Sequence, residues 1–92
     1  MRYITHKQEF EIYSSISRAY RLSHKHGFFP TWCLTLSVFK TRNTILSCLE
    51  LGYIESIAKG RFKWIADEPD IYMARDIISN WRYREVKRKD QY

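Results

Sequence analysis

Five turn residues divide this chain and limit what it can fold into. The three glycines and two prolines all fall between segments with clear apolar periodicity, where turn residues belong. They are Gly27, Pro30, Gly52, Gly60 and Pro69. A length of 92 residues leaves room for one domain, and an apolar content of 45% is enough for a compact core. We therefore expect residues 1–92 to form a single folded domain.

The first segment is typical of an amphipathic helix. Thr5 and Gln8 have the spacing of a capping box, and Gly27 ends the pattern. Apolar residues recur at the steps of a buried helical stripe, at Ile12, Tyr13, Ile16, Ala19 and Tyr20. After Pro30, residues 31–38 predict a short second helix, with Leu34 and Val38 one turn apart and facing the core.

A third helix is expected over residues 42–51, with Thr41 as its N-cap and Gly52 as its stop. On a helical wheel, one arc carries Ile45, Cys48 and Leu49, with Leu46 on its edge. The opposite arc carries Asn43, Thr44, Ser47 and Glu50. The sequence therefore predicts that the first arc is buried and that the polar arc faces solvent.

Two short runs, residues 53–58 and 62–66, are rich in aromatic and β-branched residues, and the three residues between them include a glycine. This pattern predicts a β-hairpin. A last helix is expected over about residues 67–87, capped by Asp67 or Asp70. Its buried stripe is Ile71, Ala74, Ile77, Ile78 and Trp81. A basic tail from Arg82 to Lys89 follows that stripe.

The central segment TRNTILSCLELGYIESIAKGRFKWI, residues 41–65, resembles a winged helix-turn-helix domain. In that family a capping Ser or Thr opens the recognition helix, a polar triplet follows, and a Leu-Gly-Tyr-Ile turn leads into a two-stranded wing. Phe39 and Lys40 depart from the family, which usually has Gly and an apolar residue there. The resemblance implies a mainly α fold with a small β-hairpin (α+β), namely a three-helix winged helix-turn-helix plus a C-terminal helix.

The resemblance also implies that the chain binds double-stranded DNA, as a small transcriptional regulator. Short polar side chains on an exposed helix can read base edges in the major groove, and Arg42 and Asn43 are the first candidates for this role. A cationic hairpin tip can contact phosphates or the minor groove. The expected DNA-binding residues are Lys40, Thr41, Arg42, Asn43, Thr44, Ser47, Lys59, Arg61 and Lys63. Ordinary solvated surface is the competing interpretation of these residues.

Charge is distributed in agreement with this hypothesis. The chain carries a net charge of +6, which favours a polyanionic partner. Residues 1–30 and residues 31–66 each contribute +3, whereas residues 67–92 are neutral, with acids first and bases last. The basic tail can track phosphates or keep the chain end soluble, and the sequence favours neither.

Other functions and partners stay open. A winged-helix module that docks on another protein is one alternative, and an accessory DNA-binding factor in replication or recombination of a mobile element is another. Two copies can pair through the last helix, or Tyr72, Met73 and Tyr83 can cover the first helix of the same domain.

Several classes of protein are not expected. No apolar run approaches a membrane span, and the start lacks a secretory signal, so we expect an intracellular protein. Neither a catalytic motif nor a metal or cofactor motif appears, and Cys33 and Cys48 are interpreted as buried reduced thiols.

Overall fold

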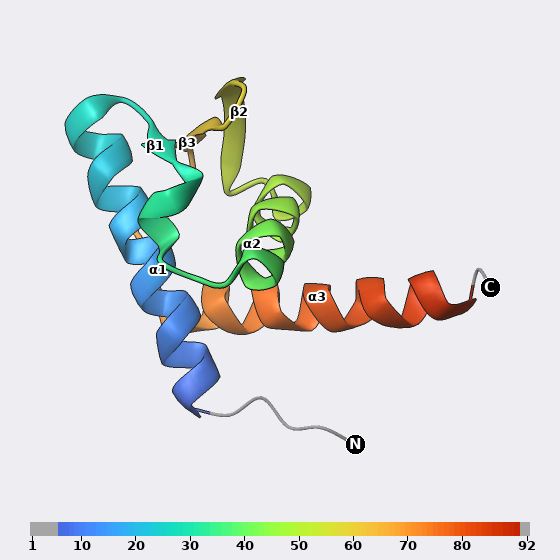
Figure 1. Ribbon diagram of the computed structural model, residues 1–92. Helices are drawn as coiled ribbons and strands as arrows, with labels where there is room; N and C mark the ends of the chain where they lie inside the picture. Colours follow the sequence, from blue (N-terminus) through green and yellow to red (C-terminus); the bar gives the residue numbers. More distant parts are fainter. Residues whose placement is uncertain (1–5, 91–92) are drawn as a thin grey trace.

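The computed structural model describes residues 6–90, and side chains within residues 6–81. The protein is mainly helical with a small antiparallel sheet, so the expected α+β class is confirmed. The elements, in chain order, are α1 (His6–His26), β1 (Phe29–Pro30), the 3₁₀ helix η1 (Thr31–Leu34), α2 (Val38–Leu51), β2 (Ile54–Ala58), β3 (Arg61–Trp64) and α3 (Ile71–Asp90) (Figure 1).

The core lies where the three α-helices meet beneath the sheet. In Figure 1, α1 crosses α3, the sheet stands at the upper end, and the second half of α3 projects beyond the body. The buried apolar side chains come from every element: Ile12, Ile16, Ala19, Phe29, Cys33, Leu34, Ile45, Cys48, Ile54, Trp64, Ala74, Ile77, Ile78 and Trp81. The stripes predicted for the first and last helices supply half of this core.

Helix α1 follows the sequence prediction closely. Its predicted stripe is inward, with Tyr13 and Tyr20 half-buried at its edge. The helix stops before Gly27, whose φ of 85° is in the left-handed region that favours glycine. The Gly27 N–H donates to the Ser23 carbonyl at 2.8 Å, which closes the last turn. The capping box at Thr5 lies outside the described residues.

The prediction of a helix over residues 31–38 is wrong. Only residues 31–34 are helical, as the 3₁₀ helix η1, and α2 begins at Val38. Thr35 ends η1, because its φ of 51° is left-handed and a right-handed helix cannot continue through that conformation. Leu34 is buried as expected, whereas Val38 points outward and is 88% exposed.

Helix α2 starts earlier than predicted, and Thr41 is not its N-cap. Ser37 holds that position, and its hydroxyl accepts a hydrogen bond from the Lys40 N–H at 3.3 Å. Thr41 lies within the helix, and its hydroxyl donates to the Leu36 carbonyl at 3.2 Å. The predicted end is confirmed: Gly52, with a φ of 80°, caps α2 through its N–H.

The predicted hairpin is present and has a third strand beside it. Strand β3 pairs antiparallel with β2 and also with β1, so the sheet order is β1-β3-β2. Lys59 and Gly60 form the turn, and Gly60 has a φ of 75°. In the added pairing, Phe29 lies opposite Phe62, and their rings are 6.0 Å apart between centroids. The end of α1 is thereby fixed beside the hairpin.

Helix α3 begins at Ile71, later than the predicted position 67. Asp70, one of the two predicted caps, accepts a hydrogen bond from the Met73 N–H at 2.9 Å. Tyr72 is exposed and Met73 is half-buried. The side chains of Tyr83 and of the basic tail lie outside the described residues. Within the described part of the chain, no helix combines the length and apolar character needed to cross a bilayer.

Candidate nucleic-acid interface

Only part of the predicted polar face of α2 is exposed to solvent. Thr44 and Ser47, expected to face solvent, are buried, with exposed fractions of 1% and 0%. Both therefore leave the candidate interface. The physical reason is that α3 packs against this side of α2, where small polar side chains fit between closely spaced helices. The Ser47 hydroxyl donates to Asn80 Oδ1 on α3 at 2.8 Å.

The remaining residues of the polar triplet differ in what they offer to a ligand. Arg42 is exposed. Asn43 is half-buried, and its Nδ2 donates to the Phe39 carbonyl of the same helix at 2.9 Å, so one amide donor is already satisfied. Beside them, the surface of α2 is more apolar than predicted, because Val38, Phe39 and Leu46 are exposed. The prediction that Leu49 is buried is also wrong, since this side chain is exposed. Arg42 is therefore the clearest base-reading candidate on this helix.

Lys40 forms an ion pair inside the molecule. Its Nζ lies 2.7 Å from Glu11 Oε1 on α1, and both side chains are about one-third exposed. A carboxylate at this distance lowers the positive potential that an approaching phosphate would meet at Lys40. Lys40 therefore fixes the start of α2 on α1 and contributes less to the interface than the sequence predicts.

The hairpin, called the wing from here on, keeps all three of its predicted cations at the surface. Lys59, Arg61 and Lys63 are exposed. The Arg61 guanidinium carbon lies 5.0 Å from the ring centroid of Phe28, within the range of a cation–π interaction. This contact joins the wing tip to the connection after α1.

Two cations of α1 lie at the same end of the molecule, a location that the sequence did not predict. Arg21 and Lys25 are exposed on the last two turns of α1. These turns contact β3, and the Trp64 N–H donates to the Ser23 hydroxyl at 2.9 Å. We call the five exposed cations of α1 and the wing the basic end: Arg21, Lys25, Lys59, Arg61 and Lys63.

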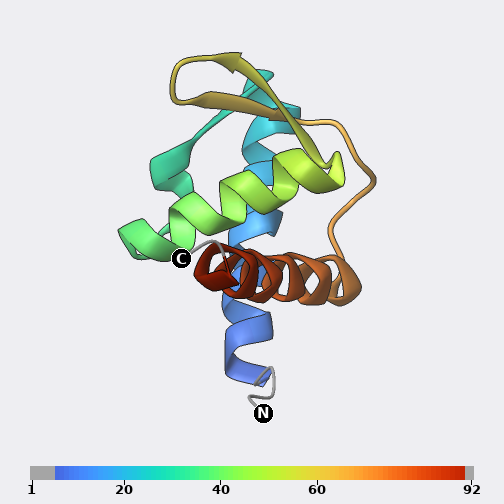
Figure 2. The same cartoon turned by 90° about the vertical axis from the view of Figure 1, so that its right-hand side faces the viewer.

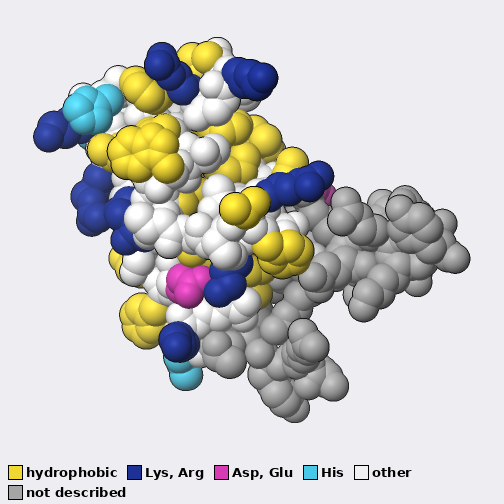
Figure 3. Space-filling model, in the orientation of Figure 1, with side chains coloured by type: hydrophobic (Ala, Val, Ile, Leu, Met, Phe, Trp, Pro, Cys, Tyr) yellow, Lys and Arg dark blue, Asp and Glu magenta, His cyan; other side chains and the backbone are white. Residues whose placement is uncertain are grey.

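Figure 3 shows Lys and Arg side chains gathered over the wing and along the α1 edge of the molecule. Residues 18–28 and 54–64 contain a single acidic residue, Glu55. Glu55 lies opposite Lys63 in the β2–β3 register. Among the described side chains, Lys40 forms an ion pair with Glu11 and Arg75 forms one with Glu9. Neither of these two cations belongs to the basic end. Asp67 and Glu68 border a hollow together with Lys63, so the excess of positive charge at the basic end is carried by its other four cations.

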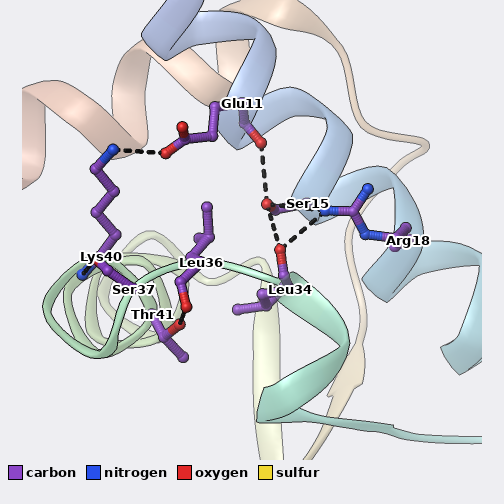
Figure 4. A network of polar contacts seen from close by, with 8 residues as sticks. All are labelled: Glu11, Ser15, Arg18, Leu34, Leu36, Ser37, Lys40 and Thr41. Atoms are coloured by element: carbon purple, nitrogen blue, oxygen red, sulfur yellow. Dashed lines mark hydrogen bonds and ion pairs between the residues drawn. The ribbon is translucent and has the colours of Figure 1, made fainter.

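A hydrogen-bond network holds the link between η1 and α2 against α1 (Figure 4). Arg18 Nε donates to the Cys33 carbonyl at 3.1 Å, and its terminal nitrogen donates to the Leu34 carbonyl at 2.9 Å. The same guanidinium donates to Thr35 Oγ1. The Ser15 hydroxyl lies 2.7 Å from the Leu34 carbonyl oxygen. Arg18 thus satisfies carbonyl groups at the end of η1 and acts as its C-terminal cap.

The cysteines are buried, as predicted, and their chemistry follows from that burial. Burial raises the pKa of the Cys48 thiol to about 12. Burial also raises the pKa of Cys33 to about 11, an effect that the nearby Arg18 charge partly opposes. Both groups are therefore thiols near neutral pH, and thiolate is the form that acts as a nucleophile or metal ligand.

The sequence shows that Arg21 and Lys25 are present on α1, but it does not show that they lie beside the wing. Their position beside the wing depends on pairing between β1 and β3. A two-residue strand that ends in proline has no recognisable alternation. Comparison of the chain with protein-family models, with curated proteins and with solved structures found no match.

Proposed function

We propose that the chain binds double-stranded DNA, with the basic end on the phosphate backbone and Arg42 as the base-reading side chain. The observation that carries this proposal is the gathering of five exposed Lys and Arg side chains from α1 and the wing. Phosphate contacts supply most of the affinity in such complexes and set the position of the protein on the duplex.

The arrangement of α2 and the wing supports the same proposal. Figure 2 shows α2 lying between the wing and α3, with the wing tip on the side of the N-terminal half of α2. Arg42 belongs to that half. A guanidinium group can pair with the O6 and N7 atoms of guanine, which is the commonest specific contact in the major groove. We also propose that the chain is a member of the winged helix-turn-helix family and that it regulates transcription.

The test is a titration of a random-sequence duplex at several salt concentrations, followed by fluorescence anisotropy. Each phosphate contact contributes about −0.9 to the slope of log affinity against log salt. The double substitution Lys59→Ala, Arg61→Ala is therefore expected to reduce the steepness of the slope by about 2. Lys7→Ala is the matched control, because Lys7 is exposed on the first turn of α1, at the opposite end of that helix.

Selection of duplexes from a random pool tests the readout by Arg42. A selected site should lose about 1–3 kcal/mol of discrimination with Arg42→Ala, while binding to random duplex changes little. Equal losses on both duplexes would refute base reading by Arg42. A salt slope that is unchanged by the wing substitutions would refute the phosphate-binding role of the basic end.

A further inference from the structure

An apolar groove lies between η1 and the first half of α2. It has a volume of about 470 Å³, and its lining residues are Thr31, Trp32, Leu36, Val38, Thr41, Arg42, Ile45 and Leu46. Figure 3, drawn in the orientation of Figure 1, shows hydrophobic side chains at the surface over η1 and α2, below the basic side chains of the wing. The groove is therefore separate from the basic end.

The two most exposed apolar side chains in the walls of the groove are not part of the hydrophobic core. Trp32 is 77% exposed and Val38 is 88% exposed. The hydrophobic core is complete without either of them, since the neighbouring Cys33 and Leu34 are the buried side chains of η1. Contiguous exposed apolar surface of this kind marks interaction sites on soluble proteins.

The walls of the groove are held in place without a ligand. The η1 side is bonded to α1 through Arg18, and the α2 side is tied to α1 by the ion pair between Lys40 and Glu11 (Figure 4). The Ser37 cap fixes the turn between the two walls. A preformed site keeps the cost of ordering on binding low, which favours affinity.

The shape of the groove matches a helix. The lining residues of α2 lie three, four, seven and eight positions after Val38, which places them on one face of the helix. The eight steps from Val38 to Leu46, at 1.5 Å each, give a wall about 12 Å long, or about two turns. An amphipathic helix presents apolar anchors over that length when they are spaced by three, four and seven residues.

The charge of the groove restricts its occupant further. Arg42 is the charged residue among the eight that line it. A second copy of the chain would bring a second Arg42 to the same interface, and each copy carries a net charge of +6, so this face is poorly suited to self-association. A carboxylate placed beside the apolar stripe of a partner helix would complement the guanidinium group.

We propose that this groove docks an amphipathic helical segment of a partner protein that carries Asp or Glu beside its apolar stripe. The proposal is independent of DNA binding, because Trp32, Val38 and the Arg18 network lie outside the basic end. Of the residues predicted to bind DNA, Thr41 and Arg42 also border the groove.

The test uses a displayed library of helical peptides in which the positions beside the apolar stripe are random. The library is selected for binding to the full chain. Enriched peptides should share an apolar stripe and an acidic residue. Their affinity should fall at least about tenfold with Trp32→Ala, since tryptophan is a frequent anchor of interfaces. Phe10→Ala is the matched control, because Phe10 is an exposed aromatic residue on α1, outside the groove. That variant should bind the peptides unchanged.

A charge reversal sharpens the experiment. Selection against Arg42→Glu should enrich peptides with Lys or Arg in place of the acid. The proposal is overturned by no enrichment, by enriched peptides without an acidic preference, or by equal binding to Trp32→Ala. It is also overturned if sedimentation shows a dimer that Trp32→Ala dissociates, because the occupant is then a second copy. Random-duplex binding by Trp32→Ala should equal that of the unsubstituted chain, which distinguishes failure of docking from failure of DNA binding.

Discussion

Helices α1 and α2 use their two faces in different ways. On α1 the buried apolar side chains are Ile12, Ile16 and Ala19, and they lie beside three buried polar side chains, Glu9, Ser15 and Ser23. On α2 two of the four buried side chains are hydroxyl groups, Thr44 and Ser47, while larger apolar side chains stay exposed. Half of the buried side chains are polar on both helices, so the difference lies in the outer faces. Among the described side chains, Phe10 is the one large apolar side chain exposed on α1, whereas α2 leaves several such side chains available to a partner. Four substitutions test this contrast.

The largest effect is expected from the aliphatic side of α1. Ile16→Ala removes a buried side chain and leaves a cavity, so the free energy of unfolding should fall by about 2–5 kcal/mol. Denaturant titration measures this change. A loss below about 1 kcal/mol would show that the α1 face is no better packed than that of α2.

The buried hydroxyl of Ser47 should have the next largest effect. Ser47→Ala removes the donor to Asn80 Oδ1 and leaves that oxygen without this bond between α2 and α3. We expect a loss of about 1–3 kcal/mol in the free energy of unfolding. Thermal unfolding followed by circular dichroism measures it, and no change in stability would contradict a structural role for the bond.

Thr44 is the matched comparison for Ser47. Its hydroxyl is buried, and within the described residues no hydrogen-bond partner lies in reach. Thr44→Val replaces the hydroxyl with a methyl group of similar size, so stability should stay the same or rise by up to about 1 kcal/mol. The same unfolding experiment applies. Destabilisation as large as that of Ser47→Ala would indicate that the Thr44 hydroxyl is bonded after all.

The smallest effect is expected on the outer face of α2. Val38→Ser removes an apolar side chain that is 88% exposed, so the free energy of unfolding should change by less than about 0.5 kcal/mol. Phe10→Ala, on the outer face of α1, serves as the control with the same expectation. If Val38→Ser alone destabilises the fold, the first turn of α2 belongs to the core and the contrast between the helices disappears.

The elements that were predicted correctly are those with a recognisable pattern in a short stretch of sequence. The stripe of α1, the stripe of α3 and the glycine turn of the hairpin are each visible within a few residues of sequence. The start of α2 was not, because Ser37 and Thr41 are both acceptable caps, four residues apart. The left-handed backbone of Thr35 and the bonds from Arg18 decide between them, and both depend on tertiary packing.

The candidate interface was predicted in its charges and less well in its orientation. The exposed cations of the wing could be named from the sequence, as could Arg42. The burial of Thr44 and Ser47 could not, because Leu46 and Leu49 are more hydrophobic and a wheel places the most hydrophobic arc inside. Close approach of α3 favours small side chains instead, and only the structure shows which side of α2 it approaches.

The pairing of β1 with β3 also bears on how the chain is made. Phe29 has its strand partner at Phe62, which is translated 33 residues later. A two-stranded ribbon alone is marginally stable in water, and non-local pairing has to overcome the entropy of closing the intervening loop. During synthesis, the pairing of β1 with β3 therefore forms only after the wing has been translated, and the basic end is assembled only when most of the chain has been made.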